Sequence, residues 1–186
     1  MTNQKDRVCP VERANSLDNK FRKWLQNPKK ILMPYIKEGM AVLDIGCGPG
    51  FFTIEIAKMV GEKGRVLAVD IQVGMLQKVS SKIKGTELEK RIKLIQSESD
   101  KINVTDKVDF ILAFWMVHEV PDKNSFFKEL YIVLKETGQF LVVEPKHFHV
   151  SKKEFELTLK TAKENGFKIM QGPKLLLSQT ALLKKT

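Results

Sequence analysis

The segment VLDIGCGPGFF (residues 42–52) decides the fold that this sequence predicts. An apolar run ending in Asp44 leads directly into Gly46, Gly48 and Gly50. Glycine lets the backbone adopt positive φ and approach a ligand closely, and a helix that begins near Gly50 would offer free N–H groups to an anion. In an open parallel sheet the first strand-to-helix turn is the usual place for a ligand. The segment therefore predicts a strand, a ligand-binding turn and a helix.

Apolar runs like this one alternate with amphipathic segments through the rest of the chain. Continuous apolar runs indicate strands buried on both faces of a parallel sheet, and their alternation with helices indicates right-handed crossovers with helices on both faces. Ser151 is expected to cap the last helix, and KETG (135–138) to end the helix before it. The predicted strands are 40–46, 65–71, 91–96, 108–115, 138–145, 167–172 and 178–185, the last two paired antiparallel, and the predicted helices are 51–60, 73–83, 122–134 and 151–165.

The size of the chain favours one domain. A chain of 186 residues buries about two-thirds of the surface that it exposes when unfolded, so its core needs no disulfide or structural metal. We expect a single domain over 1–186. It would consist of a helical cap at 1–37, in which Pro28 interrupts the helical periodicity, and an α/β core at 38–186.

Cysteine content and hydropathy indicate the cellular compartment in which the protein is expected. Cys9 and Cys47 are the two cysteines, and they lack the spacing of a metal site or a disulfide framework. The longest uncharged apolar run, 110–117, is far shorter than the roughly 20 residues that span a bilayer. These features predict a soluble, cytoplasmic protein.

The formal charge of +10 is concentrated at the two ends of the chain. Residues 1–37 carry nine Lys or Arg against three Asp or Glu, and residues 146–186 carry the same numbers. Basic ends are typical of proteins with an anionic partner such as RNA, a membrane surface or an acidic metabolite. Scattered lysines with few aromatic residues among them equally fit a solvated surface, which is the interpretation that we favour.

The spacing of acidic residues around the glycines limits the class of ligand that the loop can bind. Asp70 ends the second predicted strand, 20 residues after Gly50. A carboxylate at that place can accept hydrogen bonds from both hydroxyls of a ribose. In GCGPG (46–50) the third glycine comes one residue earlier than in the dinucleotide fingerprint, and the chain has no triphosphate-binding or hydrolase motif. The pattern predicts a nucleoside-containing ligand with a small anionic group.

Several segments of the sequence resemble those of a known family. VLDIGCGPGFF together with VLAVDI (66–71) resembles motif I and the acidic motif of class I S-adenosylmethionine-dependent methyltransferases. VDFILAFWMVHEVPD (108–122) and ELYIVLKETGQFLVVEP (129–145) resemble segments of the ubiquinone/menaquinone C-methyltransferase group. The resemblance implies a Rossmann-like, seven-stranded, mostly parallel sheet of order 3-2-1-4-5-7-6 with only strand 7 antiparallel. It also implies S-adenosyl-L-methionine as cofactor and a small-molecule methyl acceptor.

The same resemblance implies a role for each residue at a matching position. The three glycines would lie against the methionine part of the cofactor, with Asp44 orienting its amino group. Asp70 would bind the ribose hydroxyls, and Ile71 would lie against adenine. Ser97-Glu98-Ser99 stands where the family usually has Gly-Asp-Ala, at the edge of adenine. The residues implied in cofactor binding are Asp44, Gly46, Gly48, Gly50, Asp70, Ile71, Glu98 and Ser99.

Two aromatic residues and a cysteine near the expected site are open to a structural interpretation. Phe114 and Trp115 end the fourth predicted strand, where they would either belong to the core or contact adenine or the acceptor. We include Phe114 among the cofactor-binding candidates. Cys47 lies inside the glycine loop and is expected to fill space there without acting as a nucleophile.

Histidines follow the fourth and fifth predicted strands, at the edge where the acceptor is expected. His118 is the candidate catalytic residue, as a base or as a hydrogen-bond partner of the acceptor, with Glu119 and Glu144 beside it. The alternative is a loop histidine that packs against or caps the next helix. His147 and His149 complete a set of three that would suit a metal ion, but their spacing matches no specific motif, so no metal is predicted.

Two alternative functions remain open at the level of sequence. The basic ends fit an RNA methyltransferase, although no appended RNA-binding module is apparent. A non-catalytic protein that binds S-adenosylmethionine would carry the same cofactor motifs. Methyl transfer itself needs a base only for a protonated acceptor, so the motifs do not decide between these functions.

Overall fold

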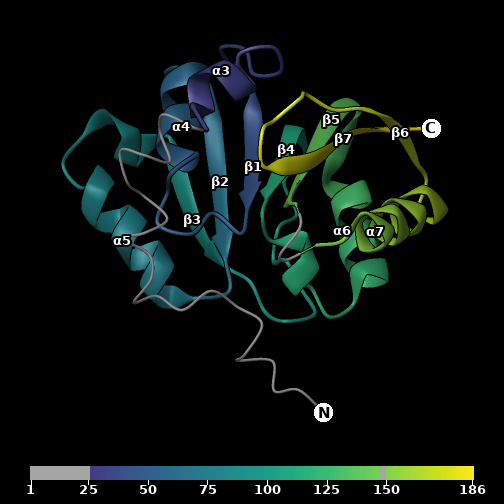
Figure 1. Cartoon of the computed structure of the whole chain (residues 1–186). Helices are drawn as coiled ribbons and strands as arrows, with labels where there is room; N and C mark the ends of the chain where they lie inside the picture. The colour runs from purple at the N-terminus through teal and green to yellow at the C-terminus, as the bar shows by residue number, and fades with distance from the viewer. Residues whose placement is uncertain (1–25, 147–149) are drawn as a thin grey trace.

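This computed structural model describes residues 26–146 and 150–186, whose strands form one seven-stranded sheet of order β3-β2-β1-β4-β5-β7-β6 (Figure 1). The expected α/β fold and strand order are confirmed. The helical periodicity at 17–25 lies outside the described residues. The strands are β1 (Ala41–Ile45), β2 (Arg65–Asp70), β3 (Ile92–Gln96), β4 (Val108–Phe114), β5 (Leu134–Pro145), β6 (Phe167–Gln171) and β7 (Ser178–Lys185).

The pairing directions follow the hydropathy of the strands. β1, in the middle of the sheet, is buried along its whole length and pairs in parallel with both β2 and β4. β7 runs antiparallel to β6, as the Gly172-Pro173 break predicted, and antiparallel to β5, as the family resemblance implied. The carboxyl ends of five parallel strands, β1 to β5, therefore lie along one edge of the sheet, where an open α/β sheet binds its ligands.

Helices cover both faces of the sheet (Figure 1). On one face, α3 (Pro28–Leu32), α4 (Thr53–Val60) and α5 (Val73–Ile83) contribute to a cluster of buried apolar residues that includes Val42 and Phe110. On the other face, α6 (Lys123–Val133) and α7 (Lys152–Glu164) contribute to a second cluster. Alternate residues of the buried strands supply the two clusters, which explains why these strands are apolar throughout.

Helix boundaries follow the capping residues. The Ser151 side chain accepts a hydrogen bond from the Glu154 backbone, and the Glu154 side chain accepts one from the Ser151 backbone, so α7 begins with a capping box. At the expected break in periodicity, Pro28 is the first residue of α3, and the Asn27 side chain caps this helix. Two short 3₁₀ turns, η3 (Glu87–Lys90) and η4 (Val117–Glu119), were not predicted. Within the described ranges, no helix is long and apolar enough to cross a membrane.

The expectation that KETG (135–138) ends α6 is wrong. α6 ends at Val133, and β5 begins at once with Leu134 paired to Val108. The next pair joins Phe110 to Gln139, so the KETG residues form a bulge at the start of the strand. The bulge is held by an ion pair of 2.7 Å between Lys135 Nζ and Asp109 Oδ1. A local sequence pattern does not reveal this pairing, because the partner strand lies about 26 residues away.

Candidate active site

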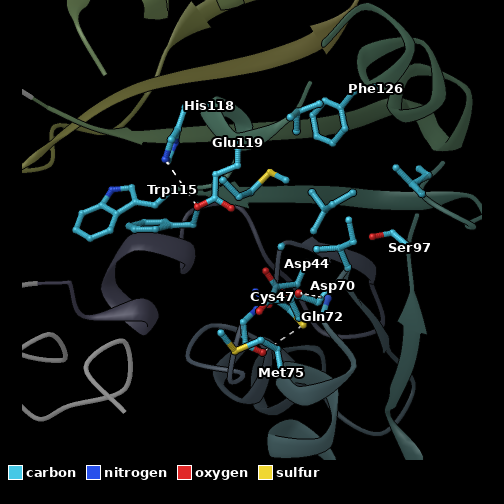
Figure 2. Close-up of a pocket in the computed structure, with 18 of the residues that line it drawn as sticks. Asp44, Cys47, Asp70, Gln72, Met75, Ser97, Trp115, His118, Glu119 and Phe126 are labelled. Carbon is cyan, nitrogen blue, oxygen red and sulfur yellow. Dashed lines mark hydrogen bonds and ion pairs between the residues drawn. The ribbon is translucent and has the colours of Figure 1, made fainter. Parts of the chain in front are cut away.

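A cavity of about 600 Å³ opens at the carboxyl edge of the sheet (Figure 2). It brings together eight of the nine expected cofactor residues and the candidate catalytic residue, although they come from the ends of four different strands and the loops that follow them. Gly50 is the exception, because it does not line the cavity. The candidates that line it are Asp44, Gly46, Gly48, Asp70, Ile71, Glu98, Ser99, Phe114 and His118.

The glycine loop follows β1 and is fixed to the end of β2. The Gly46 and Cys47 backbone N–H groups both donate to Val69 O, at 2.8 and 3.0 Å. Gly46 has a φ of +70°, and a Cβ there would lie 2.7 Å from Met116 Cγ. Gly48 has a φ of +53°, and a Cβ there would meet nothing within 4 Å. Gly46 thus lets the loop pass Met116, whereas Gly48 leaves open space beside a bare backbone.

Gly50, the ninth candidate, packs against α5, and its assignment to the cofactor stays a prediction. Gly50 has a φ of +86°, and a Cβ there would lie 3.1 Å from Val79 Cγ2 on α5. This glycine therefore allows the left-handed turn and close packing of α5 against the loop. Its neighbours Phe51 and Phe52 line the cavity instead.

Asp70 connects the glycine loop to the loop after β2. Its Oδ2 accepts a hydrogen bond from Gly48 N, and its Oδ1 accepts one from Gln72 N, both at 2.9 Å. The residue is 7% exposed, and burial raises the pKa of Asp70 while hydrogen bonds from the Gln72, Gly48 and Ile71 backbone oppose that rise. Each carboxylate oxygen has a second lone pair, so the group still has acceptor capacity toward the cavity.

Asp44 is held by the helix that follows the glycine loop. Its Oδ2 accepts a hydrogen bond of 2.6 Å from the hydroxyl of Thr53, the first residue of α4. Asp44 is 2% exposed. Thr53 is a site residue that was not predicted; its hydroxyl at the start of the helix that follows the glycine loop is the signal that could have indicated it.

Cys47 is a buried residue of the same loop. Burial, together with the negative charges of Asp44 and Asp70, raises the pKa of the Cys47 thiol well above its usual value. The thiol therefore stays protonated at neutral pH and is a poor nucleophile. Its Sγ donates to Gly48 O at 3.6 Å. This supports the expectation that Cys47 fills space in the loop.

The loops after β2 and β3 form another wall of the cavity. Ile71 is 36% exposed and presents an apolar side chain there. Glu98 and Ser99 line the cavity on the β3 side. Asn103 Nδ2 lies 3.5 Å from Glu98 Oε1, and Asn103 also donates to Gln96 O at 3.1 Å. Asn103 thus connects the two ends of the loop that carries both polar candidates.

Aromatic residues at the end of β4 are both packed and cavity-lining. The ring of Phe114 lies 4.3 Å from the ring of Phe52, centroid to centroid, and both residues line the cavity. Trp115 has a φ of +59°, which is uncommon for a bulky residue. Its Nε1 donates to Ser178 Oγ at 3.0 Å, and its backbone N donates to Val143 O at 2.7 Å. These bonds hold the Trp115 backbone in a strained conformation beside the cavity.

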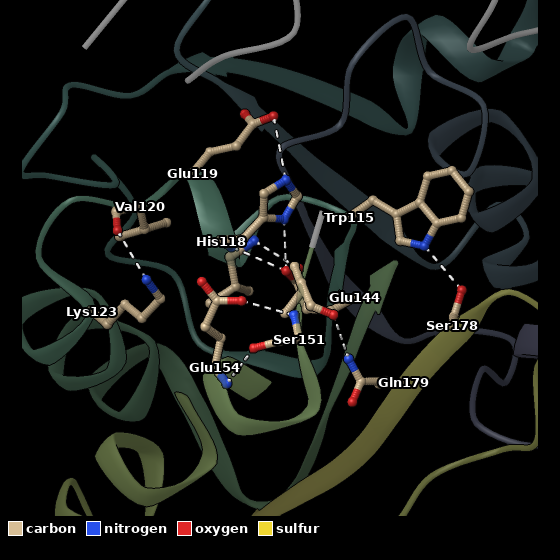
Figure 3. Close-up of polar contacts among 12 residues, drawn as sticks. Trp115, His118, Glu119, Val120, Lys123, Glu144, Ser151, Glu154, Ser178 and Gln179 are labelled. Atoms are coloured by element: carbon tan, nitrogen blue, oxygen red, sulfur yellow. Dashed lines mark hydrogen bonds and ion pairs between the residues drawn. The ribbon is translucent and has the colours of Figure 1, made fainter. Parts of the chain in front are cut away.

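His118 forms a pair with a buried glutamate (Figure 3). The distance from His118 Nδ1 to Glu144 Oε2 is 2.6 Å, and Glu144 is 1% exposed. The Glu144 carboxylate also accepts from the backbone N–H groups of Val117 and His118, at 3.0 and 3.2 Å. With both Glu144 oxygens accepting from backbone N–H groups, Nδ1 is assigned as the donor of the pair, and this tautomer leaves the lone pair on Nε2.

The surroundings of His118 raise its pKa. Burial alone would lower the pKa of the imidazole, but the hydrogen bond and charge of Glu144 and the charge of Glu119 outweigh that effect. Glu119 Oε1 lies 3.9 Å from Nε2. The geometry is that of a histidine whose orientation and tautomer are set by a buried acid, as in catalytic bases.

The second and third histidines, His147 and His149, lie outside the described residues. Among residues 26–146 and 150–186, no group of three or more His, Cys, Asp and Glu side chains is arranged to hold a metal ion.

Comparison with known proteins identifies relatives of the whole sheet. Residues 36–182 match the family model described as a methyltransferase domain. The chain is 36% identical over 110 residues to a demethylmenaquinone methyltransferase of Lactobacillus johnsonii, covering 59% of this chain and 45% of that protein. It is 28% identical over 147 residues to a ubiquinone/menaquinone biosynthesis C-methyltransferase of a Marinomonas species, covering 78% of this chain and 57% of that protein. The chain thus spans about half the length of these curated relatives.

Solved structures of similar size share the fold. A crystal structure of an S-adenosylmethionine-dependent methyltransferase from Aquifex aeolicus is similar with a TM-score of 0.84 and 29% sequence identity, over 95% of this chain and 98% of that chain. A methyltransferase structure from Methanococcus maripaludis, at 21% identity, shares the fold with a TM-score of 0.75 over 95% of this chain and 93% of that chain.

Proposed function

This chain belongs to the methyltransferase-domain family, and on that premise we propose that it transfers the methyl group of S-adenosylmethionine to a small-molecule acceptor. The observation that carries the proposal is the single cavity that joins the glycine loop and Asp70 to the His118–Glu144 pair. A donor and an acceptor bound in one cavity of about 600 Å³ would meet inside it, as an in-line displacement requires. The expected cytoplasmic location and the single domain stay predictions.

The residues of the cavity fit the cofactor. Open space at Gly48 allows a ligand to approach the backbone where any side chain would intervene. Asp70 would accept hydrogen bonds from the ribose hydroxyls, Ile71 would contact adenine, and Asp44 would face the amino group of the methionine part. Glu98, Ser99 and Phe114 would complete the adenine side. When bound, S-adenosylmethionine supplies an activated methyl group on a positively charged sulfur, which leaves as a neutral thioether.

The other end of the cavity would bind the acceptor. Trp115, Met116, Val120 and Leu177 give this end an apolar lining that suits a flat aromatic ring. The curated relatives are named for demethylmenaquinone and for ubiquinone/menaquinone biosynthesis, which supports a quinone-type acceptor in its reduced, hydroquinone form. An apolar lining favours such a molecule over an RNA chain, which proteins bind largely through its phosphates.

His118 would act as the base for a hydroxyl of the acceptor. Removing the proton makes an aromatic carbon or oxygen more nucleophilic toward the methyl group. Glu144 holds the imidazole through Nδ1 and stabilises the imidazolium after it has taken the proton on Nε2. The remaining residues position the two reactants and exclude water.

Calorimetry with S-adenosylhomocysteine tests the cofactor assignment. We expect Asp70→Asn to lower the affinity at least about tenfold, because a charged acceptor contributes roughly 1.5–3 kcal/mol to its hydrogen bonds. Asp106→Asn is the matched control, since Asp106 pairs with Arg65 and Lys93 outside the cavity and its replacement should leave the affinity unchanged. Equal affinities of Asp70→Asn and the wild type would refute the ribose contact.

Detection of the methylated product tests the acceptor. A water-soluble hydroquinone incubated with protein and isotope-labelled S-adenosylmethionine should yield a methylated product that mass spectrometry detects. Binding of S-adenosylhomocysteine without any such product would favour the non-catalytic alternative. Salt-dependent binding and methylation of RNA instead of the hydroquinone would favour the RNA alternative.

A further inference from the structure

The loop between β6 and β7 (residues 172–177) carries two exposed leucines. Leu176 is 75% exposed and Leu177 is 49% exposed, which makes Leu176 the most exposed of the large apolar side chains that the structure describes. The preceding residue, Leu175, packs against a buried apolar cluster of the core, as Trp115 also does. A turn links Ser178 N to Leu175 O at 3.4 Å. The loop is therefore anchored by one leucine and presents the next two to the outside. We call Leu176 and Leu177 the leucine tip.

The leucine tip lies at the acceptor end of the cavity. Leu177 lines the cavity, and its backbone O accepts a hydrogen bond of 2.9 Å from Lys146 N, the residue that follows β5. Ser178, directly after the tip, accepts the hydrogen bond from Trp115 Nε1. An apolar surface thus continues from the inside of the cavity, across Leu177, to Leu176 on the outside.

Exposed lysines flank the leucine tip. Lys174 precedes it by two residues, and Lys146, which also lines the cavity, is bonded to it through the backbone. Residues 146–186 as a whole carry nine Lys or Arg against three Asp or Glu. Apolar side chains that project between cationic ones match the two layers of an anionic membrane surface, in which hydrocarbon lies below phosphate groups.

We propose that the leucine tip and its two lysines dock this protein on an anionic lipid bilayer, with the mouth of the cavity toward the lipid. The proposal rests on the proposed function, because an apolar aromatic acceptor partitions into the hydrocarbon of a bilayer. Leu176 enters the acyl boundary, while Lys146 and Lys174 lie at the level of the lipid phosphates. An acceptor then passes from lipid to cavity along Leu177 with little exposure to water.

Vesicle flotation tests the apolar part of the docking surface. The wild type should float with vesicles of phosphatidylglycerol and phosphatidylcholine at low ionic strength and stay behind with pure phosphatidylcholine. Leu176→Ser should lower the binding to anionic vesicles about tenfold, from the loss of one leucine in hydrocarbon. Leu157→Ser is the matched control, because Leu157 is 54% exposed on α7 and lies outside the cavity lining. The proposal is overturned if the wild type fails to bind anionic vesicles, or if both serine variants bind equally well.

Charge neutralisation tests the cationic part. Lys174→Gln should weaken the binding about fivefold, and added salt should weaken the binding of the wild type further. Lys63→Gln, which changes an exposed lysine at the opposite edge of the sheet just before β2, should bind like the wild type. Binding that is insensitive to salt and to Lys174 would contradict an anionic partner.

A third measurement separates this proposal from the function on which it rests. Leu176→Ser should bind S-adenosylhomocysteine and methylate a water-soluble hydroquinone at the wild-type rate when no lipid is present. Product formation without vesicle binding refutes the docking surface and leaves the function standing. Vesicle binding that Leu176→Ser weakens, without product from any hydroquinone, supports the docking surface and refutes the function.

Discussion

At the level of single residues, His118 owes its chemistry to a neighbour that no solvent reaches. Glu144 is 1% exposed and accepts hydrogen bonds from the His118 ring and from two backbone N–H groups. Three donors around this buried carboxylate fix its position. The imidazole therefore keeps one tautomer and one orientation toward the cavity, whatever acceptor arrives there.

The pH dependence of methyl transfer should reveal this pair. A base must be neutral to act, so we expect kcat/KM to rise with pH, with a midpoint above 6.5, the ordinary pKa of histidine. Glu144→Gln removes the negative charge, lowers the pKa of His118 and should move the midpoint to lower pH while reducing kcat. An NMR titration of the His118 ring proton in both proteins measures the two pKa values directly.

The raised pKa of His118 also makes the stability of the protein depend on pH. Because the folded state raises the pKa of His118, the pair stabilises the protein fully below the unfolded pKa, and the contribution is lost as the pH rises through the folded pKa. Unchanged affinity of Glu144→Gln for S-adenosylhomocysteine would show that the variant is folded. A wild-type midpoint at or below 6.5, or no change in Glu144→Gln, would contradict the assignment.

Individual residues were predictable where a strand end determines their place. Asp44 and Asp70 lie at the ends of predicted strands and His118 follows one, so their meeting at one edge required only the correct sheet. The position of Gly50 against Val79 and the left-handed backbone of Trp115 depend on how side chains from distant segments pack. No local pattern in the sequence encodes such contacts.

Among the structural elements, the glycine loop needs glycine both for a positive φ and for the open space beside its backbone, and mutations can separate these two effects. Gly48 and Gly39 both have positive φ, and a Cβ at either would meet nothing within 4 Å. Alanine at either position should therefore cost a similar backbone strain of about 1–2 kcal/mol. Gly39 precedes β1, at the opposite edge of the sheet from the cavity that Gly48 lines.

We therefore expect Gly48→Ala and Gly39→Ala to lose similar stability in urea denaturation but to differ in ligand binding. Gly48→Ala should lower the affinity for S-adenosylhomocysteine, since the added methyl group occupies the space beside the loop, whereas Gly39→Ala should bind like the wild type. Calorimetry on the two variants gives the comparison. Equal affinities would mean that the cofactor does not approach Gly48.

Elements were predicted best where periodicity and caps agree. α5 begins and ends at the predicted residues, and α7 carries the expected Ser151 cap. The junction of α6 and β5 differed, because the pairing of Leu134 with Val108 overrides the local tendency of KETG to form a turn. Tertiary pairing of this kind is settled by the partner strand and by the ion pair of Lys135 with Asp109.

At the scale of the whole molecule, a ligand that binds only the folded protein raises its free energy of unfolding. The cavity is formed by loops after β1, β2, β3, β4 and β5, so a ligand in it stabilises the folded sheet as a unit. S-adenosylhomocysteine at about 100 times its Kd should add roughly 2.7 kcal/mol to the free energy of unfolding. For a chain of this size, that corresponds to a rise in Tm of about 5–10 °C.

Calorimetric scans of the wild type and of Asp70→Asn at the same ligand concentration measure this effect. The rise should be smaller in Asp70→Asn, and NADH should produce no rise in either protein. A rise with NADH and none with S-adenosylhomocysteine would overturn the assignment of the cofactor in favour of a dinucleotide.

The places of the strands could be predicted because buried parallel strands have a continuous apolar pattern, whereas their order was implied by the resemblance to a known family. For the N-terminal cap, the sequence predicted a break in helical periodicity at Pro28, and α3 begins at this residue. A sequence indicates which residues are buried more readily than it indicates what covers them.

The hydrogen bonds of Asp70 orient its carboxylate before a ligand binds. Gly48 N and Gln72 N fix both carboxylate oxygens before any ligand is present. The rotational freedom of this side chain is therefore given up during folding, and it adds nothing to the entropy that association must overcome. A nucleoside that reaches the cavity meets an acceptor already in place, so its capture depends on diffusion and desolvation and requires no rearrangement of this carboxylate.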